Sequence, residues 1–170
     1  SDLAKQGIPV FAFLNDFSSS IRRKFIGLDN YRAGRQAAWM FSNTTRKPGT
    51  VTILVGSQLW QAHQQREMGL RSFFRQSAPS FNVRDAVLNL EARKITYDMV
   101  KDIVASQEDL TGIYVAGGGG EGAINALRDS GAAGIIGTKL HPITETTPKA
   151  LGSGSLTNFI VTPTSKASNQ

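Results

Sequence analysis

Apolar and polar residues follow each other in blocks along the chain, and the blocks switch between two periodicities. Short β-branched and aromatic runs predict buried strands, and the stretches between them carry apolar residues every three or four positions, as amphipathic helices do. The predicted strands are 9–14, 25–28, 51–55, 83–88, 113–116, 134–137 and 159–161, and the predicted helices include 61–75, 96–106 and 147–151. This alternation predicts an α/β fold with a parallel sheet and helices on both faces.

The predicted elements divide unevenly along the chain. Residues 49–161 form a continuous strand–helix series, long enough for a compact lobe, whereas residues 1–43 hold only about one and a half such units, too few to cover both faces of a sheet. Residues 44–48, which end in Lys47-Pro48 just before Gly49, are typical of a linker. We therefore expect 1–43 to be the second half of another lobe, and the chain to be a piece of a two-lobed protein.

A glycine-rich stretch carries the main signal for a ligand site. The predicted strand Ile113–Ala116 runs into four glycines, Gly117–Gly120, and then into a helical pattern that ends at Gly131. Glycines at the end of a parallel strand allow a ligand to approach backbone N–H groups and the N-terminus of a helix. Open α/β sheets bind ligands at such strand ends, so the stretch predicts a small-molecule site.

Composition excludes several classes of protein. The chain has no cysteine, which rules out disulfides and thiolate metal sites, and no apolar run approaches the length of a membrane span, so we expect no membrane partner. Its net charge of +6 comes from scattered residues, among them Arg22–Lys24, Arg46 and Lys47. Without interleaved aromatic residues, zinc-finger spacing or a helix-turn-helix, this charge favours a solvated basic surface over a nucleic-acid interface.

Arg66 is the most informative single residue. It shares a helical stripe with four apolar or small residues that should face the core, namely Ala62, Gly69, Leu70 and Phe73. An arginine on that side of a helix needs a partner. It can hold ligand oxygens with its planar fork, or it can form a structural ion pair or extend to solvent.

Other polar residues at strand ends also have two interpretations. Asp29 is a good N-cap for the helix that follows, and it can also face a ligand. Asn15–Asp16 follow the first strand, where they form a turn or a hydrogen-bonding site. Trp60 can stack on a sugar ring or pack at a helix end. His63 and His141 lack metal-ligand spacing, so we expect no metal and treat both as ordinary polar residues.

The glycine run also fits the dinucleotide fingerprint, with Gly117, Gly119 and Gly122 in its three places. The acidic residue expected about twenty positions later is missing, and Lys139 ends the next strand instead. No Walker loop, Gly-x-Ser-x-Gly or His-Glu-x-x-His motif is present. A nucleotide-dependent enzyme is therefore the third alternative, and we expect neither catalysis nor a cofactor.

Three stretches resemble a known family. Ile8-Pro-Val-Phe followed by Gly27-Leu-Asp-Asn-Tyr-Arg-Ala-Gly34 resembles the I-P-V-V … V-x-x-D-N-x-x-A-G signature of the lac/gal repressor family and of the related periplasmic sugar-binding proteins. Arg66–Arg71 resembles their R-x-x-G-F helix, and Leu110–Gly117 resembles their D-x-x-A-I-x-x-x-N-D unit. The similarity covers nearly the whole chain, in order.

The resemblance implies a periplasmic-binding-protein-like (type I) domain that binds a small effector, commonly a sugar, between two lobes. Our main expectation is the effector-sensing part of a cytoplasmic, dimeric bacterial transcription regulator that reaches operator DNA through an N-terminal headpiece absent here. The alternative is a periplasmic sugar-binding protein of a transport system. In either case residues 162–170 would begin the return crossover.

The resemblance also assigns residues to the site. Arg66 matches the ligand-clamping arginine, and Asp29 matches a ligand-facing aspartate of the opposite lobe. Gly117 and Gly118 stand in place of an Asn-Asp pair, so only backbone contacts remain there. Lys139 stands where many members carry Asp or Glu. The added positive charge beside Arg66 favours an acidic or phosphorylated sugar.

Overall fold

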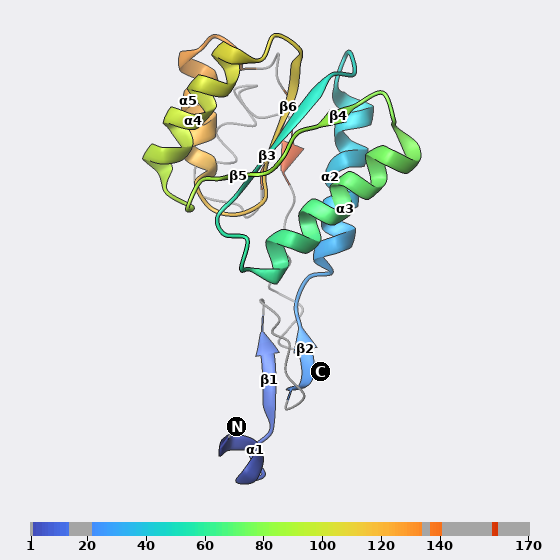
Figure 1. Cartoon of the computed structure of the whole chain (residues 1–170), viewed down its shortest axis with the longest axis vertical. Helices are drawn as coiled ribbons and strands as arrows, with labels where there is room; N and C mark the ends of the chain where they lie inside the picture. The colour runs from blue at the N-terminus through green and yellow to red at the C-terminus, as the bar shows by residue number, and fades with distance from the viewer. Residues whose placement is uncertain (1, 14–21, 134–136, 141–157, 160–170) are drawn as a thin grey trace.

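The computed structural model describes residues 2–13, 22–133, 137–140 and 158–159, which form two separate sheets (Figure 1). The larger sheet has six strands, all parallel, in the order β4-β3-β6-β7-β8, with β5 pairing β3 beside β4. These strands are β3 (Thr50–Val55), β4 (Asn82–Val83), β5 (Val87–Leu88), β6 (Leu110–Val115), β7 (Gly137–Leu140) and β8 (Asn158–Phe159). The predicted periplasmic-binding-protein-like fold with its parallel sheet is confirmed.

The smaller sheet lies below the larger one in Figure 1 and contains two parallel strands. They are β1 (Val10–Phe13) and β2 (Arg22–Ile26), and a short helix, α1 (Asp2–Lys5), precedes them. Phe11 and Ile26 on these strands are exposed, with 55% and 44% of their surfaces accessible. The two strands therefore build no core of their own among the described residues.

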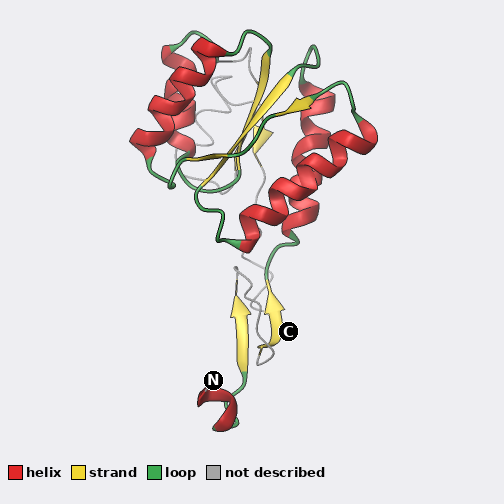
Figure 2. Cartoon of the chain, viewed as in Figure 1, coloured by secondary structure: helices red, strands yellow, loops and turns green. Residues whose placement is uncertain are grey.

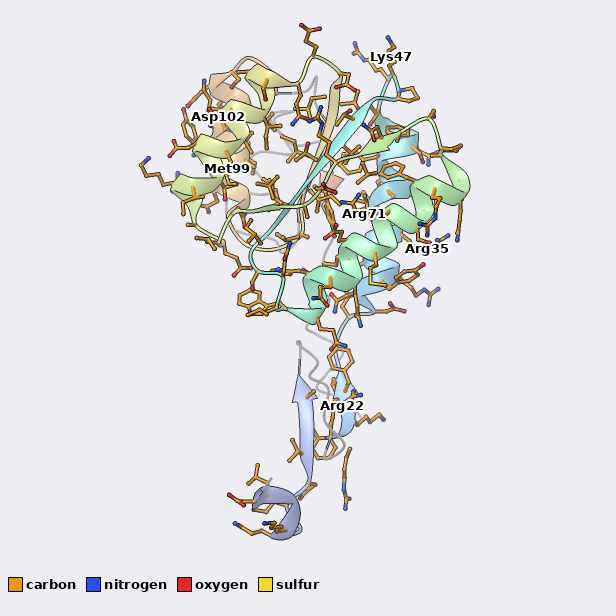
Figure 3. The ribbon with its side chains drawn as sticks, in the orientation of Figure 1. Arg22, Arg35, Lys47, Arg71, Met99 and Asp102 are labelled. Atoms are coloured by element: carbon orange, nitrogen blue, oxygen red, sulfur yellow. The ribbon has the colours of Figure 1, made fainter. Side chains whose placement is uncertain are left out.

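Helices cover both faces of the larger sheet (Figure 2). One layer contains α2 (Asn30–Thr44) and α3 (Gln61–Ser77), and the other contains α4 (Arg93–Ser106) and α5 (Gly120–Asp129). Arg35 and Arg71 mark the first layer, and Met99 and Asp102 mark the second (Figure 3). Each layer packs through its own apolar cluster, because a fully buried strand carries apolar side chains on both faces.

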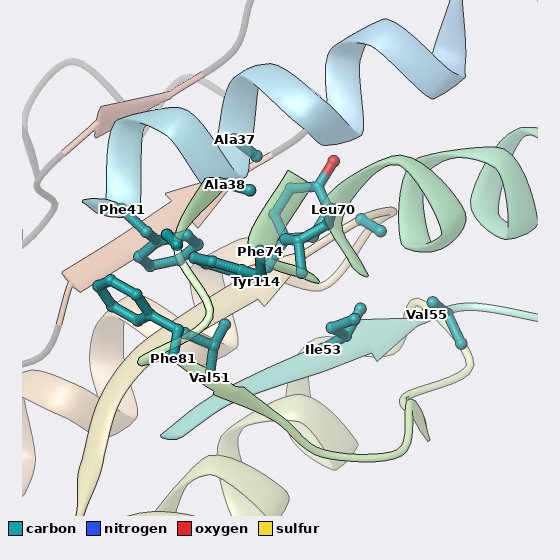
Figure 4. Packing of buried hydrophobic residues seen from close by; sticks show 12 residues of the cluster. Ala37, Ala38, Phe41, Val51, Ile53, Val55, Leu70, Phe74, Phe81 and Tyr114 are labelled. Carbon is teal, nitrogen blue, oxygen red and sulfur yellow. The ribbon is translucent and has the colours of Figure 1, made fainter. Parts of the chain in front are cut away.

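The cluster under α2 and α3 is built from aromatic and β-branched side chains (Figure 4). Phe74 stacks on Phe81 with ring centroids 4.9 Å apart, and it lies 6.4 Å from the ring of Phe41. Phe73, which the helical stripe predicted to face the core, is only half-buried, and its neighbour Phe74 takes the core position. The stripe is therefore rotated by about one residue at its C-terminal end.

Helix α2 packs on the larger sheet. Ala37, Ala38 and Phe41 are fully buried in the same cluster as Val51 and Ile53 of β3. Residues 30–43, predicted to belong to the first lobe, thus pack on the sheet formed by residues of the second predicted lobe, 49–161. The reason is the apolar face of α2, which the two-stranded sheet is too small to cover. The division of the chain into lobes otherwise stays a prediction.

The glycine-rich unit has the predicted order of strand, turn, helix and parallel strand. Strand β6 pairs with β7 in parallel, and Gly112 lies opposite Gly137. Gly131, which ends α5, has a φ of +67°, and the Gly131 and Ala132 N–H groups donate to the carbonyls of Arg128 and Leu127. This is the Schellman arrangement that favours glycine after a helix.

Several predicted elements differ from the structure in their bounds. The strand predicted at 25–28 is observed as β2 at Arg22–Ile26. The strand predicted at 83–88 is two short strands, β4 and β5, and Arg71 donates hydrogen bonds to the carbonyls of Val83 (3.0 Å) and Arg84 (2.7 Å) where β4 ends. Of the strand predicted at 134–137, residues 134–136 lie outside the described residues, and Gly137 begins β7. The helix predicted at 96–106 begins at Arg93. The helix predicted at 147–151 lies outside the described residues.

Within the described ranges, no helix combines the length and the apolar character that crossing a bilayer requires.

Candidate ligand site at the carboxyl edge of the large sheet

Three loops meet at the carboxyl edge of the large sheet. They are residues 56–60 after β3, residues 89–92 after β5 and residues 116–119 after β6. Because all three strands are parallel, their carboxyl ends lie at the same edge, where α/β sheets bind ligands. We call these residues the loop edge.

Arg66 reaches the loop edge from the first half of α3, and it connects three elements there. Its Nε donates to Oδ1 of Asn30 in α2 at 2.8 Å, and its Nη1 donates to the carbonyl oxygen of Ala116 after β6 at 2.5 Å. Both acceptors are neutral, and Arg66 forms no ion pair with a carboxylate of the described part of the chain. The structural ion pair, one of the interpretations of Arg66, is thus not observed with any described carboxylate, and the ligand-clamping role stays a prediction.

The charge of Arg66 is partly shielded from water. Burial lowers the pKa of Arg66, while the nearby Tyr114 and Glu91 side chains raise it. Nη2 makes no hydrogen bond to a described residue, so within the described part of the chain the outer edge of the guanidinium has donors that are not used. Arg66 is thus fixed by two hydrogen bonds and still able to bind an oxygen of a ligand.

The glycine loop after β6 is held in place by Asn89. This asparagine is fully buried, and its Nδ2 donates to the carbonyl of Gly118 at 2.9 Å and to Thr96 Oγ1 at 3.0 Å. Gly119 adopts a φ of +88° and caps α5, so a side chain there would be strained. The loop therefore presents its backbone in a fixed conformation.

Glu91 brings a carboxylate to the loop edge. Leu90 and Glu91 both have positive φ values, +53° and +56°, and they are the two non-glycine residues with this conformation in the described chain. The turn is stabilised by Asn89, whose Oδ1 accepts a hydrogen bond from the Glu91 N–H at 3.0 Å. Glu91 Oε1 accepts a hydrogen bond from the N–H of Gly118 at 2.9 Å.

His63 lies beside Glu91 on the first turn of α3. Its Nε2 is 3.6 Å from Glu91 Oε1, and its ring packs against Trp60 in an edge-to-face arrangement with centroids 5.0 Å apart. Only 4% of His63 is exposed. Burial lowers the pKa of His63, Arg66 lowers it further, and Glu91 raises it. The imidazole is therefore neutral at physiological pH.

Tyr114 underlies the site from the core. Burial raises the pKa of Tyr114 to about 12, with Arg66 acting in the opposite direction. The hydroxyl is buried and makes no hydrogen bond within the described ranges. Tyr114 thus lies below Arg66 as a neutral, apolar support and not as a proton donor or acceptor for a ligand.

The structure places the remaining predicted site residues as follows. Asp29 caps α2, because its Oδ1 accepts a hydrogen bond from the N–H of Arg32 at 2.9 Å; its ligand contact stays a prediction. Trp60 ends the first loop with 46% of its surface exposed, so its ring is open to a ligand as well as packed on His63. Lys139 pairs with Tyr114 in the β6–β7 ladder, and Asp16 lies outside the described residues.

Two residues of the site do not follow from the sequence pattern. The pattern predicts Asn30 only as part of a helix cap, yet Asn30 is 2% exposed and accepts the hydrogen bond from Arg66. Nothing in the sequence neighbourhood of Glu91 predicts the left-handed turn that brings it to the loop edge. Asn89, directly after a predicted strand, was the available signal.

No cluster of His, Cys, Asp or Glu with the arrangement of a metal site is found within the described ranges. Arg22 and Lys47, two of the scattered basic residues, lie far apart on the molecule (Figure 3).

Comparison with known proteins places this geometry in a family. The profile of the periplasmic binding protein domain matches residues 2–169, and the chain belongs to that family. No sequence among curated proteins matches the chain.

Solved structures share the fold. An ABC transporter solute-binding protein from Burkholderia graminis C4D1M, in complex with D-arabinose, superposes with a TM-score of 0.88 at 22% identity and covers 95% of this chain and 57% of its own. GanP, a glucose-galactose binding protein from Geobacillus stearothermophilus, gives 0.87 at 20% identity, with 95% and 57% covered.

The periplasmic component of an ABC-type sugar transport system from Hahella chejuensis gives a TM-score of 0.85 at 21% identity, with 94% of this chain and 59% of its own chain covered. The chain thus spans less than two thirds of the length of these proteins.

Proposed function

We propose that the chain is the sugar-binding part of a periplasmic solute-binding protein of a transport system. The observation that carries this proposal is the position of Arg66, fixed by Asn30 and Ala116 at the loop edge with donors that no described residue uses. A planar guanidinium of this kind suits the vicinal oxygens of a sugar. Membership of the periplasmic binding protein domain family supports it.

The loop edge offers the groups that a sugar needs. Arg66 supplies donors, Glu91 supplies an acceptor, and Trp60 supplies an exposed aromatic face on which a sugar ring can stack. Such a site binds through hydrogen bonds and stacking and makes or breaks no covalent bond. We therefore propose a binding protein and not an enzyme, with a second lobe closing over the ligand.

The similar structures support the transport function. They include components of ABC transporters, one of them in complex with D-arabinose, and a glucose-galactose binding protein. This evidence favours a periplasmic location over the cytoplasmic one that the sequence analysis put first.

The effector-sensing domain of a lac/gal-type transcription regulator is the second candidate. Its support is the resemblance of Gly27–Gly34 and Arg66–Arg71 to signatures that both groups share. A homodimer and contact with operator DNA belong to this candidate alone. The segment that the gene encodes before Ser1 separates the two, since a regulator carries a helix-turn-helix there and a transport protein carries an export signal.

Calorimetry on the full polypeptide that the gene encodes tests the proposal. We expect saturable binding of at least one neutral pentose or hexose, and a clear loss of affinity in Arg66→Lys. Arg75→Lys, an exposed arginine of the same helix, is the matched control and should bind as the wild type does. Absence of binding to D-arabinose, glucose, galactose and other common monosaccharides would overturn the proposal.

A further inference from the structure

We propose that Glu91 determines the charge preference of the sugar site, so that it takes neutral sugars and rejects acidic ones. This inference rests on the proposed sugar-binding function. It revises the expectation from the sequence, where Arg66 and Lys139 favoured an acidic or phosphorylated sugar.

Three glycines from two loops surround the Glu91 side chain and leave room for it. A Cβ atom at Gly117 would lie 2.6 Å from Glu91 Oε1, and one at Gly118 would lie 2.8 Å from Glu91 Cβ. A Cβ atom at Gly56 would overlap Glu91 Cγ. Real side chains do not approach this closely, so the glycines at these positions are matched to the carboxylate.

The carboxylate is also held in one orientation. Gly118 N–H donates to its Oε1, and the turn that carries it is fixed through Asn89. One third of the Glu91 side chain remains exposed, although it lies between loops. A fixed, accessible carboxylate accepts hydrogen bonds from hydroxyl groups, which is the function lost where Gly117 and Gly118 replace an Asn-Asp pair.

At the loop edge, the charges of Arg66 and Glu91 offset each other without a ligand. Arg66 contributes one positive charge and Glu91 one negative charge, and His63 between them is neutral because burial and Arg66 lower its pKa. A neutral sugar leaves this balance intact. A uronic acid or a sugar phosphate brings a second anion near Glu91, and like charges in a partly desolvated site repel strongly.

The test compares each neutral sugar with its own uronic acid, glucose with glucuronate and galactose with galacturonate, on the full polypeptide. We expect the wild type to bind the neutral member at least about tenfold more tightly. In Glu91→Gln, which keeps the shape and the acceptor oxygen but removes the charge, this ratio should fall towards one. Glu108→Gln, the same change at an exposed residue outside the loop edge, should leave it unchanged.

Salt gives a second measurement that needs no variant. Raising the ionic strength screens the repulsion, so the wild type should lose part of its preference for the neutral sugar. Equal or tighter binding of the uronic acid by the wild type would overturn the inference, as would an unchanged ratio in a folded Glu91→Gln. If neither member of any pair binds to the wild type, the sugar-binding function itself fails.

Discussion

Gly69 of α3 packs against the backbone of Tyr31 in α2, and a Cβ atom at Gly69 would overlap the Tyr31 carbonyl oxygen. The contact is reciprocal, because a Cβ atom at Gly34 of α2 would overlap the carbonyl oxygen of Arg66 in α3. The two helices therefore approach backbone to backbone at the level of Arg66. This close approach brings Asn30 within hydrogen-bonding distance of the guanidinium.

Gly69→Ala should destabilise the protein by roughly 1–3 kcal/mol, because the added methyl group must separate α2 from α3. The sign is informative, since alanine is the better helix former by about 1 kcal/mol and would stabilise an isolated helix. Urea unfolding measures the change. Ser77→Ala at the exposed end of α3 is the control and should stay within about 0.5 kcal/mol of the wild type. A more stable Gly69→Ala would contradict the packing.

Arg66→Lys should lower both stability and ligand affinity. A lysine cannot donate to Asn30 and Ala116 together, so the free energy of unfolding should fall by about 1–3 kcal/mol. Sugar affinity should fall by roughly 1.5–3 kcal/mol for the lost contact with ligand oxygens. Thermal unfolding and calorimetry on one preparation give both quantities. A loss of stability with unchanged affinity would make Arg66 a structural residue only.

Asp29 has two roles that one pair of variants separates. Asp29→Ala removes the cap of α2 and should cost about 0.5–2 kcal/mol of stability, whereas Asp29→Asn should keep most of it because asparagine also caps helices well. If the carboxylate contacts the ligand, Asp29→Asn should bind sugar more weakly at nearly unchanged stability. Equal affinities of Asp29→Asn and the wild type would restrict Asp29 to capping.

His63 should make the protein less stable in acid. Its folded-state pKa lies below the ordinary value of 6.5, so between that lowered pKa and 6.5 the unfolded chain binds more protons than the folded one. The free energy of unfolding therefore falls as the pH drops below about 6.5, by up to about 1.4 kcal/mol per pH unit.

Urea unfolding at pH 5 to 8 measures this dependence, and His63→Gln should flatten it. His141→Gln changes the second histidine of the chain and serves as the control. A pH profile of His63→Gln that coincides with the wild type would assign the acid sensitivity to other groups.

Much of the fold followed from periodicity, because strands buried on both faces read as continuous apolar runs and Gly131 marks the end of its helix. The split between β4 and β5 could not be predicted, since no glycine or proline interrupts 83–88, and the contacts of Arg71 with the carbonyls there join residues more than ten positions apart in the chain. The start of α4 at Arg93 could not be predicted either, because its N-cap, Ala92, has no side chain that could cap the helix.

The site was predicted only where local pattern was enough. Arg66 stood out because a charged residue interrupted an apolar stripe, and Gly117 and Gly118 because they followed a strand. Glu91 could not be found in this way, because its position depends on two consecutive residues in a left-handed conformation that neither side chain favours. The hydrogen bond between Arg66 and Asn30 could not be predicted either, because it depends on tertiary packing, namely the close approach of α2 and α3.

Arg66 donates a hydrogen bond to Asn30, the first residue of α2. Only residues 27–29 lie between Asn30 and Ile26, the last residue of β2. The chain passes there from the small sheet to the large one. A ligand bound to the free edge of this guanidinium would therefore be one side chain away from the segment that joins the two sheets. The loop edge and the junction between the sheets thus share Arg66 as a common contact.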